Sequence, residues 1–453
     1  MRRIAKLSAL AICSAVALTV WAQSPGGVTV TGAKAGPSKD GLIPAFAGQD
    51  KPLPGWSYGK FRGDYWKYKD EKPLFSIDAS NYMKYADKLS PGQIELFKKI
   101  KGYRMDIYPT HRDCGYPDWV DANIKKNATY AKLTPDGNHI QQAILPGLPF
   151  PAAKTGQEAI WNYLSRYRGV GTEWPKTYTM VSPRPGSNTW ISVTSKQTMY
   201  YPWGKKGANK LTPDENLFSI YFAYETPAAF AGQALVQNYH FGDSNAESFY
   251  YFPGQRRVRR MPSYNYDAPQ IGFENQYTID EAKLFNGDID RFNWTLAGEK
   301  EMYVPYNDFG MFNFKKSVGD VFKNNDVDPS ARRYELHRVY VLVATLKPNM
   351  RHISQKKVLY LDEDTYLALA GEDYDAQGKL YKVKEGYPIP VWELGGTCEL
   401  EPFAQYNLTS GQYVDDQSVI GGGKDIRFFE ESNDPRFRGD YYTAENLRSI
   451  SER

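Results

Sequence analysis

Between Tyr178 and Lys384 the chain repeatedly alternates aromatic or β-branched residues with polar ones. Successive side chains of a strand point to opposite faces of its sheet, so this alternation predicts strands with one buried face. Short turns such as Asp362-Glu363-Asp364 separate the segments and no helix recurs between them, which predicts an antiparallel sheet. The predicted strands are residues 178–182, 189–201, 218–225, 235–241, 247–252, 294–304, 333–346, 356–361, 365–373 and 379–384.

Two amphipathic helices are predicted ahead of these strands. Ser90-Pro91-Gly92-Gln93 supplies a capping serine, a proline at the first helical position and a glutamine three residues after the cap. Thr155-Gly156-Gln157-Glu158 is a second capping box, and apolar residues follow it at helical spacing. Because both helices are short and have one apolar face, we expect them to lie on the sheet in an α+β fold.

The first residues have the pattern of a cleavable signal peptide. A cationic start is followed by an uncharged apolar run, and Val20-Trp21-Ala22 places small residues at the two cleavage positions. We therefore predict a signal peptide over residues 1–22, cleaved after Ala22. A retained anchor is the alternative, although the run is shorter than the about 20 apolar residues that cross a bilayer. Cys13 does not make a lipoprotein site, because Ile12 stands where a small residue is required.

Beyond the signal peptide, two regions are distinguished by their composition. Residues 23–73 are rich in Gly, Pro and Lys and have no lasting periodicity, so we expect an extended N-terminal arm that wraps a folded body. Residues 74–453 form the β-domain with its helices and a C-terminal tail. The formal net charge is only +4 and basic residues do not gather into one dominant block, so nothing favours nucleic acid as a partner.

Two cysteines remain once the signal peptide is removed. An oxidising periplasm would allow Cys114 and Cys398 to form a disulfide. The alternative is a pair of unrelated buried thiols.

The aromatic content is unusual, since 15% of the residues are aromatic and 35 are Tyr. A tyrosine ring is apolar while its hydroxyl binds water or backbone, so tyrosine suits the wall of a cavity. Strand propensity in a secreted protein explains the same composition, and both explanations stay open here.

Several short motifs together resemble a known family. They are Asp40-Gly41-Leu42-Ile43-Pro44, residues 251–260, 285–292, 301–307, 360–365 and 374–380, and Asp434-Pro435-Arg436-Phe437. In combination they resemble the domain-of-unknown-function family thirteen twenty-nine, whose members are related in fold to the outer-membrane lipoprotein-sorting proteins (LolA-like). The resemblance covers nearly the whole chain after the signal peptide.

This resemblance implies a strongly curved antiparallel sheet, a half-open β-barrel, with helices packed on its concave face. The space between sheet and helices is then an apolar pocket for acyl chains or other hydrophobic molecules. It also implies the periplasm of a Gram-negative bacterium, with possible outer-membrane association. The implied partners are an inner-membrane exporter of the resistance-nodulation-division type and an outer-membrane protein. The chain is far longer than the lipoprotein carriers, so lipoproteins need not be its cargo.

A cluster of arginines, Arg256-Arg257-Val258-Arg259-Arg260, follows a Pro-Gly turn. In a strand, Arg257 and Arg259 would point to one face and Arg260 to the other. An arginine on the less solvated face needs a carboxylate or a ligand anion. We consider two interpretations, a structural ion pair with a carboxylate such as Asp280, Asp288 or Asp290, and a headgroup clamp in which Arg257 and Arg260 bind an anionic lipid.

The sequence contains little that indicates catalysis. The five histidines are scattered without metal-ligand spacing, and neither a nucleophile elbow nor a catalytic cysteine pattern occurs. Residues 362–364 match a calcium loop only in charge and are expected to form a hairpin turn. We therefore expect no enzyme activity, no metal and no cofactor.

The leading hypothesis is a periplasmic carrier or chaperone that holds a lipid or other hydrophobic compound between sheet and helices. Aromatic residues that share a strand face are the expected pocket wall, namely Phe222 with Tyr224, and Tyr250 with Phe252. Ordinary core packing is the alternative for these four. Two alternative functions are a structural accessory subunit of an export complex without cargo and, less favoured, an enzyme acting on envelope polysaccharide or lipid.

Overall fold

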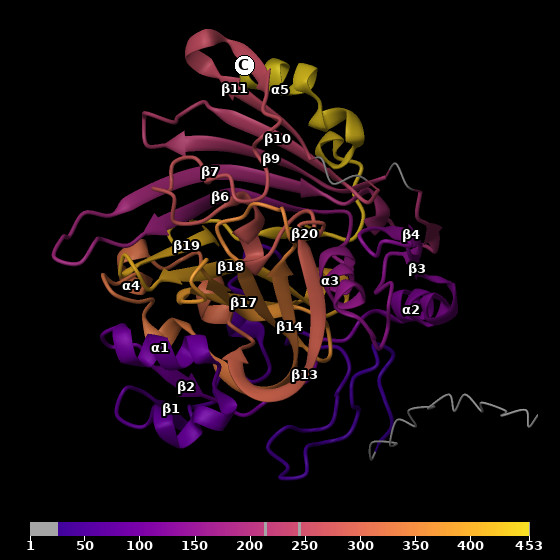
Figure 1. Cartoon of the computed structure of the whole chain (residues 1–453), viewed down its shortest axis with the longest axis vertical. Coiled ribbons are helices and arrows are strands. Elements are labelled where there is room, and N and C mark those ends of the chain that lie inside the picture. The colour runs from indigo at the N-terminus through magenta and orange to yellow at the C-terminus, as the bar shows by residue number, and fades with distance from the viewer. Residues whose placement is uncertain (1–25, 213–214, 243–245, 453) are drawn as a thin grey trace, which may run out of the picture.

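One large sheet carries the fold (Figure 1). The computed structural model describes residues 26–212, 215–242 and 246–452, so the predicted signal peptide lies outside the described residues. Within this part the sheet is 16-stranded, in the order β1-β2-β14-β15-β16-β17-β18-β19-β6-β7-β9-β10-β11-β12, with β13 paired to β14 and β20 to β6. Neighbouring strands are antiparallel except β2 and β14, which confirms the predicted antiparallel sheet.

The strands of this sheet vary from three residues to long central ones. They are β1 (Phe75–Ile77), β2 (Met105–Ile107), β6 (Gly171–Val181), β7 (Ile191–Tyr200), β9 (Asn216–Thr226), β10 (Ala234–His240), β11 (Glu247–Phe252), β12 (Arg257–Arg260), β13 (Phe292–Pro305), β14 (Tyr334–Leu346), β15 (Lys356–Asp362), β16 (Ala368–Tyr374), β17 (Leu380–Val391), β18 (Thr397–Asn407), β19 (Gln412–Ser418) and β20 (Arg427–Phe429). Two small two-stranded sheets pair β3 (Lys132–Leu133) with β4 (Ile140–Gln142) and β5 (Ile144–Leu145) with β8 (Asn209–Lys210).

The helices are few and short. They are α1 (Pro91–Lys99), α2 (Asp118–Tyr130), α3 (Gly156–Ser165), α4 (Val318–Val321) and α5 (Ala444–Ser451). The 3-10 helices are η1 (Arg62–Tyr65), η2 (Tyr82–Lys88), η3 (Pro202–Gly204), η4 (Pro253–Gln255), η5 (Ile279–Leu284), η6 (Phe309–Phe312), η7 (Pro329–Ala331), η8 (Trp392–Leu394), η9 (Pro435–Phe437) and η10 (Gly439–Tyr442). Among the described residues, no helix combines the length and apolar character needed to cross a membrane.

Local sequence signals located the two predicted helices correctly. Ser90 caps α1 and Thr155 caps α3, each in a complete capping box with the residue three positions on. By contrast α2, which begins after Pro117 with no side-chain cap, was not predicted. A cap that satisfies free backbone N–H groups leaves a trace in the sequence, whereas a helix held by packing alone does not.

The helices cover both faces of the sheet. On one face α3 packs against β13 so closely that a Cβ at Gly156 would meet the Trp294 backbone. On the opposite face α1 meets Val383 of β17 and Glu372 of β16. Helix α5 also lies on that opposite face, where Leu447 joins a separate core cluster with Tyr251.

The N-terminal arm lies across the body of the protein. Arg62, in η1, reaches Glu393 at 2.7 Å and Asp425 at 3.0 Å, and both partners are more than 300 residues away in the chain. Lys34 donates its backbone N–H to Glu363 in the β15–β16 turn at 2.7 Å. Ile43 and Trp66 are also buried in the main core, so ion pairs, backbone contacts and apolar packing together fix the arm to the β-domain.

Candidate functional site

Residues 264–286, the covering segment, lie across one face of the sheet and touch strands that are far apart in it (Figure 1). Tyr224 of β9 donates its hydroxyl to the Ile271 carbonyl oxygen at 2.7 Å. Gln405 of β18 donates to the Glu281 carbonyl oxygen at 3.0 Å. Because one short segment reaches both strands, the sheet must curve around it, and this face is the concave one. The α+β fold with a strongly curved sheet, which is not closed into a barrel, agrees with the prediction.

The covering segment has an irregular backbone. Helix η5 is interrupted at Ala282 and Lys283, where the dihedral angles are not helical. Residues other than glycine rarely adopt a positive φ, and each instance costs of the order of 1 kcal/mol or more. Five such residues occur in this segment, namely Tyr266, Glu274, Asn275, Lys283 and Leu284. Contacts with the sheet, rather than regular secondary structure, therefore hold the segment in place.

A small cavity of about 50 Å³ remains between the covering segment and the sheet. A water molecule needs some 10–15 Å³ of such space, so the cavity has room for a few waters but not for an acyl chain. The sheet contributes the apolar residues Met199, Phe218, Ile220, Phe222 and Leu235 to its lining, and also the polar residues Gln197, Gln237, Asp416 and Gln417. The open hollow implied by the family resemblance is occupied at this position by the protein's own covering segment.

The four predicted wall aromatics share the concave face. Pairing of Leu235 with both Phe222 and Tyr250 places these side chains on one side of the sheet. Phe222 lines the cavity and contacts Tyr224 with ring centroids 4.6 Å apart. Tyr250 is buried and donates to Gln233 at 2.7 Å, while Phe252 is half-buried beside it. Phe222 is therefore the member of this set that reaches the cavity.

The arginine cluster lies elsewhere than the headgroup-clamp hypothesis requires. Strand β12 forms the end of the sheet, and its arginines are exposed. Arg257 pairs in register with Phe252 on the concave side, but Arg260 lies on the opposite side and forms an exposed ion pair with Glu247 at 3.2 Å. For Arg260 this is the structural ion pair of the first interpretation, but with Glu247 of the neighbouring strand rather than with Asp280, Asp288 or Asp290.

A cluster of buried charges lies under the covering segment and was missed by the sequence analysis. The sheet contributes Lys357, Lys382 and Lys384, whose exposed fractions are 0%, 4% and 0%, together with Asp373. The covering segment contributes Asp280 and Glu281, which are also buried. Lys382 and Lys384 are two residues apart in β17 and therefore point to the same face. The sequence shows this spacing, but lysines at alternate positions are usually typical of a strand face exposed to solvent.

Direct contacts neutralise this cluster. Glu281 binds Lys382 at 2.6 Å, and Asp373 binds Lys384 at 2.7 Å. Asp280 accepts from His352 at 2.7 Å. Burial disfavours the charged carboxylates, but the surrounding lysines outweigh it and hold the pKa of Glu281 well below its usual range. The pKa of Asp280 is likewise lowered, by Lys357 and His352 against the effect of burial.

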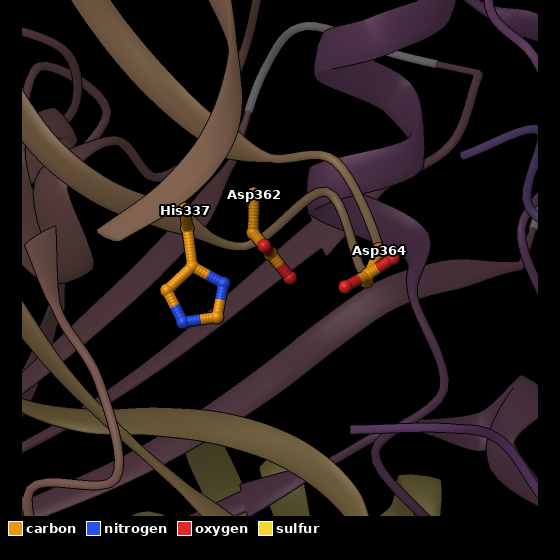
Figure 2. Close-up of side chains that lie close together, drawn as sticks. All are labelled: His337, Asp362 and Asp364. Atoms are coloured by element: carbon orange, nitrogen blue, oxygen red, sulfur yellow. The ribbon is translucent and has the colours of Figure 1, made fainter. Parts of the chain in front are cut away.

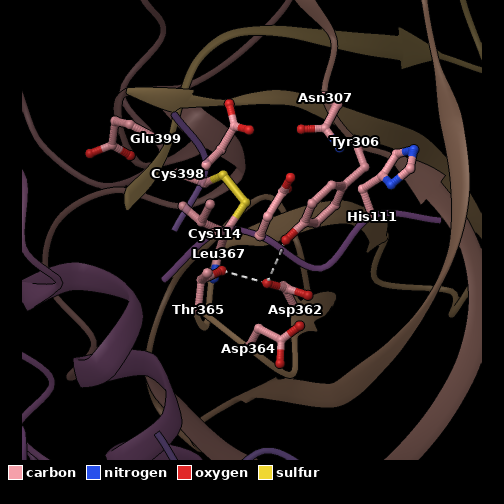
Figure 3. Close-up of a disulfide and its surroundings, with 12 residues drawn as sticks. His111, Cys114, Tyr306, Asn307, Asp362, Asp364, Thr365, Leu367, Cys398 and Glu399 are labelled. Atoms are coloured by element: carbon pink, nitrogen blue, oxygen red, sulfur yellow. Dashed lines mark hydrogen bonds between the residues drawn. A yellow bond between two sulfur atoms is a disulfide. The ribbon is translucent and has the colours of Figure 1, made fainter. Parts of the chain in front are cut away.

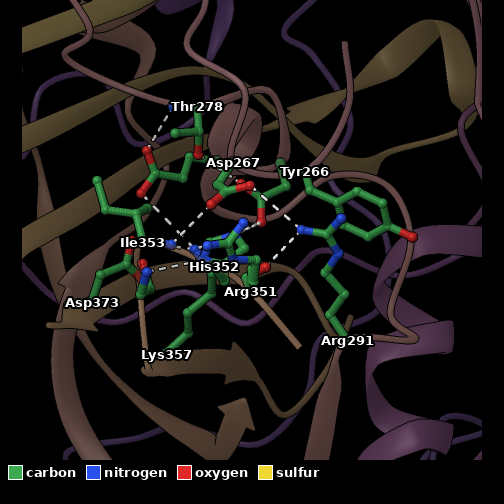
Figure 4. Close-up of polar contacts among 12 residues, drawn as sticks. Tyr266, Asp267, Thr278, Arg291, Arg351, His352, Ile353, Lys357 and Asp373 are labelled. Atoms are coloured by element: carbon green, nitrogen blue, oxygen red, sulfur yellow. Dashed lines mark hydrogen bonds and ion pairs between the residues drawn. The ribbon is translucent and has the colours of Figure 1, made fainter. Parts of the chain in front are cut away.

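A second set of polar contacts fastens the covering segment near its start (Figure 4). Asp267 forms an ion pair with Arg291 at 3.5 Å and accepts the backbone N–H of Ile353 at 3.0 Å. The Arg291 guanidinium lies 3.6 Å from the ring centroid of Tyr266, and it also donates to the Arg351 carbonyl oxygen. These groups are partly exposed, unlike the lysine cluster.

A disulfide joins Cys114 and Cys398 on the opposite face of the sheet (Figure 3). It ties the segment that follows the N-terminal arm to β18, across a sequence separation of 284 residues. Both cysteines are buried in an apolar cluster with Val304 and Leu400.

Near this disulfide, His337, Asp362 and Asp364 place possible ligand atoms within 4.8 Å of one another (Figure 2). Asp362 ends β15, and Asp364 lies in the hairpin turn that follows it and that was predicted from the sequence. Arg112 binds both oxygens of Asp364, at 2.7 and 2.9 Å. A carboxylate oxygen of Glu335 lies within hydrogen-bond distance of His337 Nε2, at 3.0 Å, so protein groups already engage the cluster.

Comparison with known proteins identifies a family. The model of the family described as "Protein of unknown function (DUF1329)" matches residues 76–448. An uncharacterized protein of Pseudomonas aeruginosa is 34% identical over 416 residues, which are 90% of this chain and 89% of that protein.

Solved structures are similar at low sequence identity. A crystal structure described as an outer membrane lipoprotein-sorting protein domain, from Vibrio parahaemolyticus, has 16% identity and a TM-score of 0.42, over 65% of this chain and 98% of that one. A DUF1329 family protein from Desulfovibrio piger has 15% identity and a TM-score of 0.40, over 63% and 96%. A LolA superfamily protein from Nitrosomonas europaea has 12% identity and a TM-score of 0.35, over 64% and 100%. Given the family match over most of its length, the chain belongs to the DUF1329 family.

Proposed function

We propose that this protein is a periplasmic carrier that holds a hydrophobic compound against the concave face of its sheet. The observation that carries the proposal is the group of apolar side chains Met199, Phe218, Phe222 and Leu235, which the irregular covering segment overlies. Apolar side chains of a sheet are usually sealed by a helix or a second sheet with a regular backbone. Here a strained segment does this, held by polar contacts and by buried residues such as Phe273, Ile279 and Leu284, so an apolar ligand can take its place.

Binding then requires the covering segment to move. The cavity of about 50 Å³ must enlarge several-fold to accept an acyl chain. Each methylene group that leaves water for the apolar wall contributes about 0.8 kcal/mol, which offsets the energy needed to detach the segment from the sheet. The process is burial and release without a covalent step, so no catalytic residue is assigned.

The location and the partners belong to the same proposal. A disulfide between Cys114 and Cys398 fits an oxidising compartment, and the N-terminal pattern fits export through a signal peptide cleaved after Ala22. A carrier in the periplasm needs a donor and an acceptor membrane. We propose that a resistance-nodulation-division type exporter is its partner at one membrane and an outer-membrane protein its partner at the other. Co-purification from cross-linked cells tests each of these two partners.

One alternative is favoured by a specific observation. Because the covering segment fills the concave face, the protein could act as an accessory subunit of an export complex without cargo of its own. Extraction of the purified protein with organic solvent, followed by mass spectrometry, separates the two functions. A lipid in equimolar amount supports the carrier, whereas a protein free of lipid that also excludes an added apolar probe supports the accessory subunit.

The apolar probe N-phenyl-1-naphthylamine gives a quantitative test with a matched control. Met199 lies on the cavity wall, while Met83 is exposed on η2. The carrier predicts that Met199→Gln weakens probe binding several-fold and that Met83→Gln leaves it unchanged. Equal binding by both variants would locate the probe elsewhere and contradict the proposed site.

A further inference from the structure

The covering segment supplies most of the negative charge that the buried lysines face. Glu281 lies 2.6 Å from Lys382, 3.7 Å from Lys384 and 3.9 Å from Lys357. Asp280 lies 3.8 Å from Lys357. Asp373, on β16, is the carboxylate of the cluster that belongs to the sheet, at 2.7 Å from Lys384 and 3.5 Å from Lys357.

Movement of the covering segment would leave this cluster unbalanced. The sheet keeps three lysines and one carboxylate, a formal charge of +2, once Asp280 and Glu281 are withdrawn. Lys283 leaves with the segment and its partner Glu401 of β18 stays, but Glu401 lies in a separate group whose two arginines, Arg166 and Arg168, balance Glu399 and Glu401. Removal of one partner from a buried ion pair is strongly unfavourable. An anion that replaces the two carboxylates therefore removes the electrostatic part of the cost of leaving, and an apolar tail must replace the buried packing of residues such as Phe273, Ile279 and Leu284.

The covering segment links the lysine cluster to the apolar wall. Ile279 and Ala282, the residues on either side of the acidic pair, line the cavity together with Phe222 and Leu235. Displacement of the segment would thus uncover a cationic group and an apolar surface on the same face of the sheet. A ligand that satisfies both must have an anionic head and an apolar tail.

We propose that Asp280 and Glu281 occupy the place of an anionic headgroup, and that the cargo is an amphiphile with a phosphate or carboxylate head. This inference rests on the proposed carrier function and names the class of its ligand. Lys357, Lys382 and Lys384 bind the head, while Met199, Phe218, Phe222 and Leu235 contact the tail. The acidic pair closes the empty carrier by binding the same lysines.

Binding of twelve-carbon probes by the mature protein tests the headgroup. We expect dodecyl phosphate to bind at least about tenfold more tightly than the neutral 1-monolaurin, since a hydrogen bond to a charged group contributes about 1.5–3 kcal/mol. Laurate, with a single carboxylate, distinguishes a carboxylate head from a phosphate head. Lys382→Gln should weaken dodecyl phosphate binding roughly tenfold and leave monolaurin binding unchanged. Arg260→Gln, on the opposite face of β12, is the matched control and should change neither.

The acidic pair gives a second, independent measurement. Glu281→Gln leaves Lys382 without its carboxylate, so we expect a lower melting temperature without ligand and a larger rise with dodecyl phosphate than in the wild type. If this variant does not fold, the effect of Lys382→Gln on dodecyl phosphate binding still tests the headgroup site. Equal affinity for dodecyl phosphate and monolaurin would refute the headgroup site and leave the carrier intact. Binding of none of the three probes would refute both.

Discussion

Removal of the disulfide between Cys114 and Cys398 is expected to destabilise the protein by a large and calculable amount. The bond closes a loop of 284 residues. In the chain-entropy model, a cross-link over such a loop reduces the entropy of the unfolded chain enough to stabilise the native state by about 5.6 kcal/mol at 25 °C. This value exceeds that of most single contacts, because the loop spans most of the β-domain.

Urea unfolding, followed by tryptophan fluorescence, measures this effect. Oxidised wild type is compared with wild type unfolded and refolded in a reducing agent, and with the Cys114→Ala/Cys398→Ala double variant. Both cysteines are buried, so the double variant loses a further ~1 kcal/mol per sulfur through poorer packing. The reducing agent should not change the unfolding midpoint of the double variant, so the double variant is the internal control.

The reasoning fails if oxidised and reduced wild type unfold at the same urea concentration. Such a result would mean that the two thiols do not form a bond in the exported protein, or that the unfolded chain is already constrained. A difference near 5 to 6 kcal/mol would instead identify the disulfide as a main tie between the segment after the N-terminal arm and β18.

Three further predictions concern stability. Phe222→Ala should cost about 3–4 kcal/mol in urea unfolding, because the ring is buried against Tyr224, and a cost below about 1 kcal/mol would contradict tight packing there. Although burial opposes its charge, Arg333 and His337 lower the pKa of Glu335 to about 2 from the usual 4.5. This group therefore stabilises the fold by about 3 kcal/mol above pH 4.5 and loses that contribution as the pH falls toward 2, so Glu335→Gln should flatten the acid side of the stability curve. Thr155→Ala should cost about 1 kcal/mol through loss of the α3 cap, whereas an unchanged unfolding midpoint would mean that packing alone defines this helix end.

Local patterns predicted a large part of the fold. Strand β11 has the predicted bounds, and β13 and β14 differ from prediction by one or two residues. Alternation of side chains is a local property of a strand, and a capping box is a local property of a helix start, so both can be read from short stretches. The two capped helices, α1 and α3, were found for the same reason.

Strands β18 and β19 were not predicted, because their polarity does not indicate their burial. Glu399 and Glu401 of β18 have exposed fractions of 1% and 0%. Their partners, Arg166 and Lys283, come from α3's end and from the covering segment, more than 100 residues away. Short-range alternation cannot identify such partners. The same limit explains why the lysine cluster was missed and why the exposed Arg260 was overvalued.

The buried lysine cluster is difficult to explain as a device for stability alone. Replacement of buried ion pairs by apolar residues of similar size is often neutral or even stabilising, so an ion network adds little that leucine or methionine could not supply. It does, however, make closure of the covering segment dependent on charge. The left-handed backbone at Lys283 and Leu284 further raises the energy of the closed state at the point where Glu281 binds the sheet. A segment that is strained and held in part by exchangeable carboxylate–lysine contacts is suited to leave when an amphiphile replaces both those contacts and the packing of Phe273, Ile279 and Leu284 in the core.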